Sequence, residues 1–383
     1  MTSSRKITAV RTVTVGAGWR NYVFVLLETD IGVTGLGEAS LGGQTNAVVG
    51  AIRDLEPLLI GADPFRIEHL WQQAFRHAFW RGGVTFLSAL SGIEVALWDI
   101  KGKALGVPIH TFMGGLARSR VRAYANGPRG NTPEELAESA ARLVERGFTA
   151  LKFTPFDATP ILAGTRTIDA AVARVAAVRE AVGPTIDLMI DAHGRLSPNV
   201  ASRVAVALEP YGVMFFEEPC LPEHVPTLVR LARKSPVPIA VGERHYTRWG
   251  VAELLASRTI NVLQPDIIQS GGLAEARKMA ALAESCFVSV APHNPWSWVN
   301  TVASLHLDAV IPNFLIQEVI TEEEPWRDAI VKNPPALDAD GYLPVPMLPG
   351  LGIELDLEAA EAFPPVRDRP PAFWHEDGSV ADW

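Results

Sequence analysis

Cysteine, long apolar runs and basic clusters are all scarce in this sequence. The two cysteines, Cys220 and Cys286, are too few for a disulfide framework and lack the spacing of a metal site, so we expect buried thiols in a reducing compartment. No apolar run approaches the length of a membrane span, and the segment 1–6 has no signal-peptide core. We therefore expect a cytoplasmic protein that does not enter a membrane.

Positive charge is also in deficit, because 34 Lys and Arg stand against 43 Asp and Glu, a formal net charge of −9. The sequence has no run rich in Lys and Arg, so nucleic acid is not an expected partner. Hydrophobic residues make up 48% of the chain, which is typical of a well-cored globular protein. A chain of 383 residues is long for one domain, so we expect a barrel of roughly 200–250 residues and a smaller domain.

One unit repeats between Ile186 and Val319. A short apolar run rich in β-branched residues ends in an acid or a histidine, and a Gly or Pro break and a helical pattern follow. The terminal residues, spaced 23 to 27 apart, are Asp191, Glu217, Glu243, Asp266, His293 and Glu318. That spacing fits a strand, two turns and a helix, so the repeat predicts parallel βαβ units. In a closed parallel barrel, polar groups at equivalent strand ends indicate an active site.

Two earlier strands, at 121–126 and 148–153, complete a set of eight. Residues before them are predicted to form an α+β unit. Its expected strands are 6–15, 22–29 and 33–38, and its expected helices are 47–59, 67–78 and 87–105. We expect a capping domain of residues 1–120, completed by about 345–383, and a catalytic α/β barrel of residues 121–344.

Three carboxylates follow consecutive strands of the predicted barrel. Because such strands are neighbours, we expect Asp191, Glu217 and Glu243 to lie side by side, where they would repel one another strongly. All-oxygen ligation favours a hard divalent cation, Mg²⁺, which keeps positions open for substrate oxygens. The alternative is that individual acids form salt bridges, for instance with Arg195 or Arg244.

Two histidines flank this acidic trio. His193 lies two residues after Asp191, so it points to the same mouth if the strand continues that far. His293 ends the seventh strand, opposite the third in a ring of eight, and Asp266 on the neighbouring strand is placed to hold one of its ring nitrogens. Histidine serves as base or acid near neutral pH. A single histidine at a strand end is more often structural, but this pair indicates chemistry.

Further side chains near the strand ends are considered for the site. His245 lies two residues after Glu243 and enters the mouth by the same argument, as a substrate contact. Glu318 could hydrogen-bond a developing oxyanion if protonated, or pair with Lys152. Glu218 alternates away from the mouth and is expected to be structural.

A hard cation, an Asp-supported histidine and a second histidine opposite suit removal of the proton α to a carboxylate. The cation stabilises the enediolate, which is essential because that proton is so weakly acidic. An acid on the other wall then protonates a departing β-hydroxyl, so a 2,3-dihydroxy acid loses water. The alternatives are an epimerase or racemase of a 2-hydroxy acid, and a non-catalytic metabolite-binding barrel. The poised pair of Asp266 and His293 argues against the last.

Six motifs in order carry a resemblance to a known family. They are Asp191–Arg195, Glu217–Pro219, Gly242–Arg244, Gln264–Asp266, Ala291–Pro295 and Gln317–Glu318. With Phe79–Gly83 and Ala96–Lys103, they resemble the mandelate racemase subgroup of the enolase superfamily, and within it the acid-sugar dehydratases of galactonate and gluconate type. The resemblance covers nearly the whole chain.

The resemblance implies a modified TIM barrel, (β/α)₇β, with an α+β N-terminal capping domain. It implies a hydro-lyase in which Asp191, Glu217 and Glu243 bind Mg²⁺ and a histidine is the base. His293, paired with Asp266, would take the C2 proton, His193 would protonate the leaving 3-hydroxyl, and Glu318 would stabilise the enediolate. The product would be a 2-keto-3-deoxy acid. A small-molecule sugar acid is the expected substrate, and a homo-oligomer is the expected assembly.

The end of the second strand departs from one branch of this family. Members that racemise or cycloisomerise carry a Lys-x-Lys pair there, and here the second lysine is replaced by Thr154, which argues against those reactions. Lys152 would then contact the substrate or pair with the carboxylates. Cap loops set specificity in this superfamily, here 16–21 and 39–46. The candidate substrate contacts are Lys152, His245, Arg20 and Trp296. Gluconate, galactonate, arabinonate, xylonate and fuconate remain open.

Overall fold

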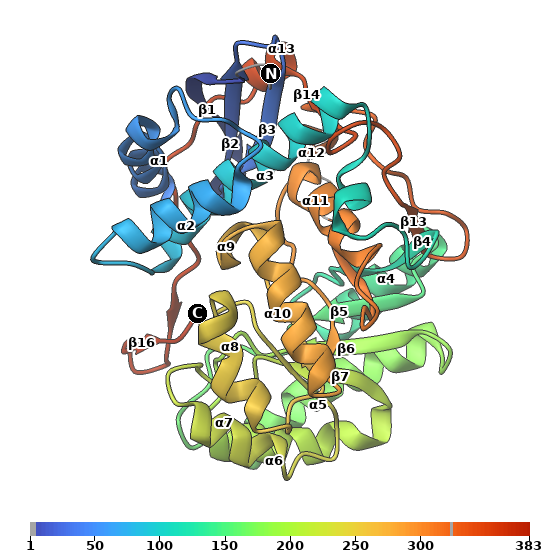
Figure 1. The fold of residues 1–383 in the computed structure, drawn as a ribbon. Coiled ribbons are helices and arrows are strands. Elements are labelled where there is room, and N and C mark those ends of the chain that lie inside the picture. The colour runs from blue at the N-terminus through green and yellow to red at the C-terminus, as the bar shows by residue number, and fades with distance from the viewer. Residues whose placement is uncertain (1–4, 322–324) are drawn as a thin grey trace.

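The computed structural model describes residues 5–321 and 325–383, and a cap containing the N-terminal region lies against a barrel (Figure 1). The cap opens with an antiparallel sheet in the order β1 (Ile7–Ala17), β2 (Arg20–Thr29) and β3 (Thr34–Glu38). The helices α1 (Thr45–Leu59), α2 (Ile67–His77) and α3 (Val84–Leu105) follow. Strand β3 can pack closely on α3 because Gly37 has no Cβ atom. A Cβ atom at this position would collide with the carbonyl oxygen of Gly92.

The barrel consists of parallel strands in the order β10-β9-β8-β7-β6-β5-β4-β11. Their bounds are β4 (Arg120–Asn126), β5 (Ala150–Phe153), β6 (Asp187–Asp191), β7 (Val213–Glu217), β8 (Ile239–Val241), β9 (Val262–Leu263), β10 (Ser289–Val290) and β11 (Gln317–Ile320). A parallel bridge between Val290 and Phe314 joins the two ends of this order. These are the eight strands that the sequence predicts.

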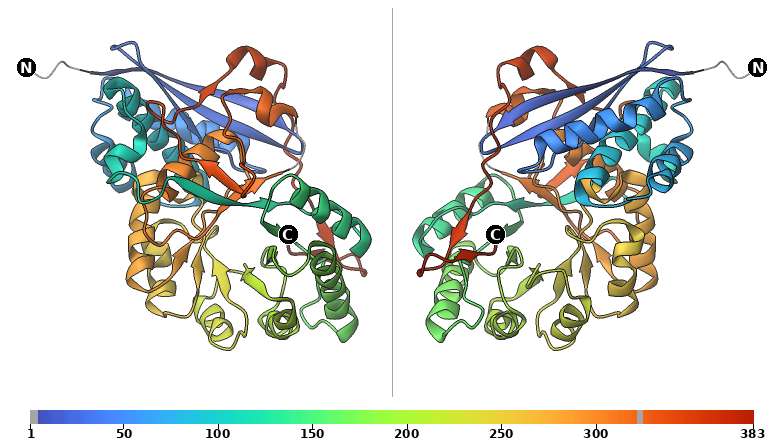
Figure 2. Two further views of the ribbon diagram at one scale, coloured as in Figure 1. Left: turned by 90° about the vertical axis from the view of Figure 1, so that its right-hand side faces the viewer. Right: turned by 90° about the vertical axis from the view of Figure 1, so that its left-hand side faces the viewer.

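Helices alternate with these strands and cover the outside of the barrel (Figure 2). They are α4 (Pro133–Glu145), α5 (Thr165–Val182), α6 (Pro198–Leu208), α7 (Val225–Ala232), α8 (Thr247–Ala256), α9 (Ile267–Ser270), α10 (Leu273–Ser285) and α11 (Trp298–Asp308). Helix α4 begins with a capping box, in which Thr132 and Glu135 satisfy each other's backbone N–H groups. In the described chain, no helix is both long and apolar enough to cross a membrane.

The interior of the barrel is filled by side chains. Each strand, or the residue next to it, contributes one member of a buried apolar cluster: Tyr124, Ala150, Met189, Phe215, Ala240, Val262, Ala291 and Ile316. A filled interior leaves no pore, so polar groups can meet only at the rim, beyond the carboxyl ends of the strands.

The part of the chain after the barrel contacts both the barrel and the cap. It contains α12 (Pro325–Ala329), β12 (Val331–Lys332), β13 (Tyr342–Pro344), β14 (Glu354–Leu355) and α13 (Leu357–Glu361). Strand β13 extends the barrel sheet by pairing antiparallel with β4. Further on, the carbonyl of Phe363 accepts from Gly16 N, and Arg369 N donates to the carbonyl of Trp19. The C-terminal segment therefore lies against the cap.

Buried acids of the cap hold it on the barrel. Glu38, at the end of β3, accepts from Ser297 Oγ and from Asn300 N at the start of α11. Glu94 of α3 accepts from Leu273 N at 2.8 Å and from Ala274 N at 3.0 Å at the start of α10. Burial raises the pKa of both acids, that of Glu94 to about 7. Each carboxylate satisfies N–H groups that a helix start leaves free, so the cap is fixed directly beside the rim.

The buried His306 of α11 should make the stability of the fold depend on pH. Its Nδ1 accepts from His110 N, and its Nε2 donates to the carbonyl of Leu351, so the fold holds a neutral ring. Burial lowers the pKa of His306 from 6.5 to about 3. The unfolded chain binds the proton more readily in this window, so stability is lost as the pH falls from about 6.5 toward 3.

We predict that His306→Gln flattens this part of the pH profile. The measurement is the free energy of unfolding by urea between pH 7 and pH 4, for the wild type and for His306→Gln. His375→Gln serves as the control, because this histidine lies in the exposed C-terminal hairpin. Equal slopes for the wild type and His306→Gln would show that His306 is not held neutral.

Candidate active site

Lys152, on β5, is buried among three of the carboxylates at the rim. Its Nζ lies 2.5 Å from Glu217 Oε1, 2.9 Å from Glu318 Oε1 and 3.6 Å from Asp191 Oδ2. Burial opposes the charge on Lys152, but Glu217 and Glu318 outweigh it and raise the pKa of Lys152 well above its usual value. The ammonium thus offsets part of the negative charge of this cluster in the structure.

Glu243 lies apart from Lys152, on the side of His293. Strand β8 ends at Val241, so Glu243 follows in a turn, and its Oε2 lies 3.4 Å from His293 Nε2. Burial raises the pKa of Glu243, and the neighbouring His293 opposes this. The same Oε2 is buried without a hydrogen-bond partner. Glu217 is fixed from behind, because Gln264 Nε2 donates to its Oε2 at 2.7 Å.

The donor set suits a hard cation in its chemistry. Asp191 and Glu217 are buried and Glu243 is largely buried; burial raises the pKa of Glu217, and the charges of Asp191 and Glu243 raise it further. The oxygen of Glu243 that accepts no hydrogen bond is the kind of group that a Mg²⁺ ion would satisfy. In the described residues, however, no group of three or more His, Cys, Asp or Glu side chains is arranged around a common point as metal ligands would be.

His193 reaches the site by a route different from the expected one. Strand β6 ends at Asp191, and His193 lies in a turn with φ of 49°, so strand alternation does not orient it. The turn folds back on Asp191, whose Oδ1 accepts from His193 N at 2.8 Å and whose Oδ2 lies 3.0 Å from His193 Nε2. The other ring nitrogen is 3.2 Å from Thr154 Oγ1. Burial opposes the charge on Asp191, but His193 and Lys152 lower the pKa of this acid.

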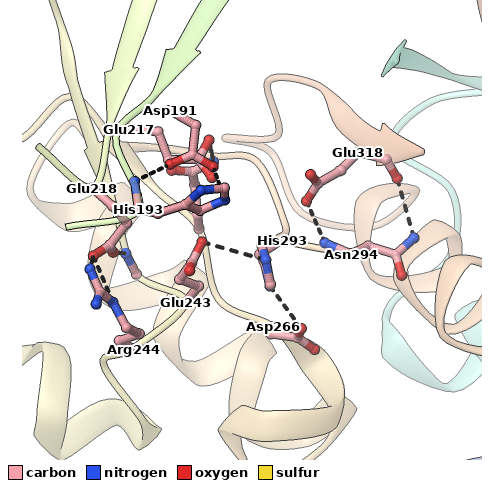
Figure 3. Close-up of polar contacts among 12 residues, drawn as sticks. Asp191, His193, Glu217, Glu218, Glu243, Arg244, Asp266, His293, Asn294 and Glu318 are labelled. Carbon is pink, nitrogen blue, oxygen red and sulfur yellow. Dashed lines mark hydrogen bonds and ion pairs between the residues drawn. The ribbon is translucent and has the colours of Figure 1, made fainter. Parts of the chain in front are cut away.

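The structure brings His293 and Asp266 together (Figure 3). His293 Nδ1 lies 2.9 Å from Asp266 Oδ2, and Trp296 Nε1 donates to the same oxygen at 2.7 Å. The other carboxylate oxygen accepts from Ile268 N at 3.0 Å, because Asp266 caps the start of α9. Burial opposes the charge on His293, but Glu243 and the hydrogen bond to Asp266 raise its pKa to about 10. The imidazole therefore binds a proton strongly.

Glu318 is held by three donors. Asn126 Nδ2 donates to its Oε1 at 2.7 Å, Asn294 N donates to its Oε2 at 2.6 Å, and Lys152 Nζ lies 2.9 Å from its Oε1. Burial opposes its charge, but Lys152 and His293 lower the pKa of Glu318. Of the two alternatives that the sequence left open, the structure contains the ion pair.

The arginines considered as salt-bridge partners of the metal candidates have other contacts. Arg244 donates from Nε at 3.1 Å and from Nη2 at 2.7 Å to one oxygen of Glu218, which also accepts from Gly242 N through its other oxygen. Arg195 Nη1 donates to the carbonyl of Phe156 at 2.6 Å. Glu218 is thus structural, because it shapes the turn that carries Glu243; it lies beyond β7 with φ of 39°, so strand alternation is not what orients it.

The remaining candidates lie around the site rather than among the carboxylates. Arg20 is buried; its Nη2 donates to the carbonyl of Pro295 at 2.5 Å, and its guanidinium lies 4.7 Å from the ring centre of Trp296. His245, in the turn after β8, is buried with both ring nitrogens unpartnered, and burial lowers its pKa. The contacts of Arg20 and Trp296 lead to Asp266, so their placement favours support of the base over direct contact with a ligand.

Several residues of the site received no role from the sequence. They are Gln264, Asn294, Asn126 and Thr154, whose hydrogen bonds are given above. Gln264 lies two residues before Asp266, Asn294 directly follows His293, and Thr154 directly follows β5, the strand of Lys152. Their position in the sequence is the one sign that they belong to the site. Amides and hydroxyls at strand ends are common, however, and the partners of these four residues are far away in the sequence.

Comparison with known proteins agrees with this arrangement. Residues 3–114 match the family described as mandelate racemase / muconate lactonizing enzyme, N-terminal domain, and residues 135–360 match the enolase C-terminal domain-like family. The chain belongs to the enolase superfamily. The predicted mandelate racemase subgroup and the modified TIM barrel are thereby confirmed.

Relatives of known name and structure extend this result. A protein of Verminephrobacter eiseniae named D-galactonate dehydratase is 40% identical over 99% of this chain and 100% of its own length. A mandelate racemase/muconate lactonizing enzyme structure from Jannaschia sp. CCS1 is 34% identical with a TM-score of 0.89, covering 95% of this chain and 99% of that one. A member of the enolase superfamily from Salmonella Typhimurium is 32% identical with a TM-score of 0.89, covering 94% and 99%. The predicted enzyme class, a dehydratase of this superfamily, is confirmed.

Removing the amine of Lys152 should destabilise the protein strongly. Lys152→Met leaves buried carboxylates without their cation, and breaking a buried ion pair in this way costs about 3–5 kcal/mol. The measurement is urea unfolding in EDTA. Lys278→Met is the matched control, because its ion pair with Glu68 is partly exposed and worth at most about 1 kcal/mol. Equal losses in the two variants would contradict the role given to Lys152.

Proposed function

We propose that this enzyme dehydrates a sugar acid, an aldonate, to a 2-keto-3-deoxy acid with Mg²⁺ as its cofactor. The observation that carries the proposal is the placement of two imidazoles beside buried carboxylates, with His293 bonded to Asp266 and His193 bonded to Asp191. Such a pair supplies one base and one acid, which is what loss of water from a 2,3-dihydroxy acid requires. D-galactonate is the first substrate to test, because relatives of this chain are named D-galactonate dehydratase.

His293 is the proposed base for the C2 proton. Its Nδ1 is engaged by Asp266, so Nε2 is the nitrogen left to face the substrate, next to Glu243. Trp296 and Asn300 hold Asp266 from behind and fix the imidazole's orientation. With its pKa raised to about 10, the ring holds its proton at neutral pH, so its action as a base requires that the charge of Glu243, the largest cause of this rise, be offset, as a cation bound to Glu243 would do.

His193 is the proposed acid for the leaving 3-hydroxyl. Asp191 and Thr154 contact the two ring nitrogens, so one of these contacts has to open when the ring protonates the hydroxyl; the side chain is 25% exposed, so it can meet a ligand at the mouth. Thr154 occupies the position of the second lysine of racemising relatives, and its hydroxyl positions His193 instead of acting as a base. This contact favours dehydration over 1,1-proton transfer.

The carboxylates supply the electrostatic part of the mechanism. Asp191, Glu217 and Glu243 would hold Mg²⁺, which when bound stabilises negative charge that develops on the substrate carboxylate. Glu318 is kept in place by Asn126, Asn294 N and Lys152, and its proposed part is to stabilise the enediolate. Burial of the cluster strengthens every one of these interactions.

Activity should appear in a screen of acid sugars. Purified protein with Mg²⁺ is incubated with D-galactonate, gluconate, arabinonate, xylonate and fuconate, and keto acid is measured. We expect keto acid from at least one aldonate, its loss in EDTA and its recovery when Mg²⁺ is returned. A C2 epimer without keto acid would favour the epimerase, and binding without turnover or C2 exchange would favour a metabolite-binding barrel.

Isotope exchange at C2 should distinguish the roles of the two histidines. His293→Asn should lower both dehydration and exchange of the C2 hydrogen in D₂O by about 10²-fold or more, because the base is lost. His193→Asn should lower dehydration to a similar extent and leave C2 exchange in place. Proton NMR of the recovered aldonate measures the exchange. The opposite pattern would reverse the two roles.

A further inference from the structure

The chain after α13 connects the cap to the mouth of the barrel. Asp368 accepts from Asn21 Nδ2 at 2.9 Å and from Thr45 N at 3.1 Å, and Val366 N donates to Asn21 Oδ1 at 2.8 Å. These contacts fix the segment to β2 and to the start of α1. From there a hairpin leaves the cap and descends to the barrel (Figure 2).

The hairpin pairs β15 (Phe373–Trp374) with β16 (Val380–Ala381). Its turn is built locally, because Asp377 accepts from both the backbone N–H and the hydroxyl of Ser379. We call residues 373–383 the tail hairpin. It contributes little to the core, since Trp374 is 59% exposed and Val380 is 74% exposed. Core packing does not explain why this segment lies at the mouth.

Aromatic contacts attach the tail hairpin beside the proposed acid. The ring of Trp383 meets that of His193 edge to face, with ring centres 5.0 Å apart at 61°. Phe373 supports the indole at 6.5 Å and 86°, and its own ring lies 4.3 Å from the guanidinium carbon of Arg195. His193 and Arg195 stand in the same turn after β6, so the tail hairpin is packed on the segment that carries the acid.

We infer that Trp383 is a wall of the substrate pocket next to the leaving 3-hydroxyl and a positioning residue for His193; this deepens the proposed dehydration and rests on it. Asp191 and Thr154 fix the ring nitrogens of His193, and the indole limits rotation of the ring from a third side. Trp383 is 45% exposed, so part of its surface is open to a ligand. An indole offers an apolar face to the C–H groups of an aldonate chain and an N–H to its hydroxyls.

The inference predicts a selective loss in Trp383→Ala. Dehydration of the aldonate that the wild type converts fastest should fall about tenfold, because an edge-to-face aromatic contact of this kind is lost. Exchange of the C2 hydrogen in D₂O should stay within about twofold, because it depends on His293. Trp383→Phe should recover most of the dehydration rate, since it keeps an aromatic edge.

Trp374→Ala is the matched control, because it removes an exposed tryptophan from the same hairpin. We expect its dehydration and exchange rates to equal those of the wild type. If Trp383→Ala lowers dehydration and exchange in equal proportion, or changes neither, the inference is overturned. Absence of both reactions in the wild type would instead overturn the proposed function.

The contact itself is tested without a substrate. Protein labelled with ¹³C in its nine histidines gives ring signals, and the signal of His193 is the one missing in His193→Asn. Trp383→Ala should shift this signal, because an indole close to the ring changes its magnetic environment, and Trp374→Ala should not. A His193 signal that is the same in both variants and in the wild type would show that the tail hairpin does not lie on the acid.

Discussion

The fold depends on neutralising carboxylates that are buried together at one end of a barrel. The barrel interior is filled with apolar side chains, so the polar strand ends meet only at the rim. There Lys152 offsets part of the charge of Asp191, Glu217 and Glu318, and His293 faces Glu243. Like charges at this distance are tolerated only when a cation lies among them or when one of the acids is protonated. This group of buried carboxylates lowers the stability of the fold, and it also provides a site for chemistry on an anionic substrate.

The cap is fixed to the rim by the same kind of interaction. Glu38 and Glu94 reach across to the starts of α11 and α10, where unsatisfied N–H groups favour a carboxylate. Helix α11 follows the loop of His293, and Arg20 of β2 lies on Trp296 in that loop. The cap therefore supports the proposed base through contacts that are independent of any ligand, and the tail hairpin reaches the proposed acid from the opposite end of the chain.

Much of the fold could be predicted from the sequence, because a strand that ends in a polar residue every 23 to 27 residues has few solutions other than a barrel. The positions of His193 and His245 are harder to predict, because the strands before them end earlier than the sequence pattern indicates, at Asp191 and Val241. His193 has a left-handed backbone conformation that brings its ring back to Asp191, and no local sequence pattern predicts this turn. The contacts of Trp383 join residues 190 positions apart, so only the folded chain reveals them.

The central claim is that Asp191, Glu217 and Glu243 meet around one divalent ion between the two imidazoles. A crystal structure with Mg²⁺ and a sugar acid tests it most directly. We expect one ion with an oxygen of each carboxylate about 2.0–2.1 Å away, and His293 Nε2 facing C2 of the ligand. An ion bound elsewhere, or His293 turned away from the ligand with these carboxylates held by Lys152 alone, would contradict the account.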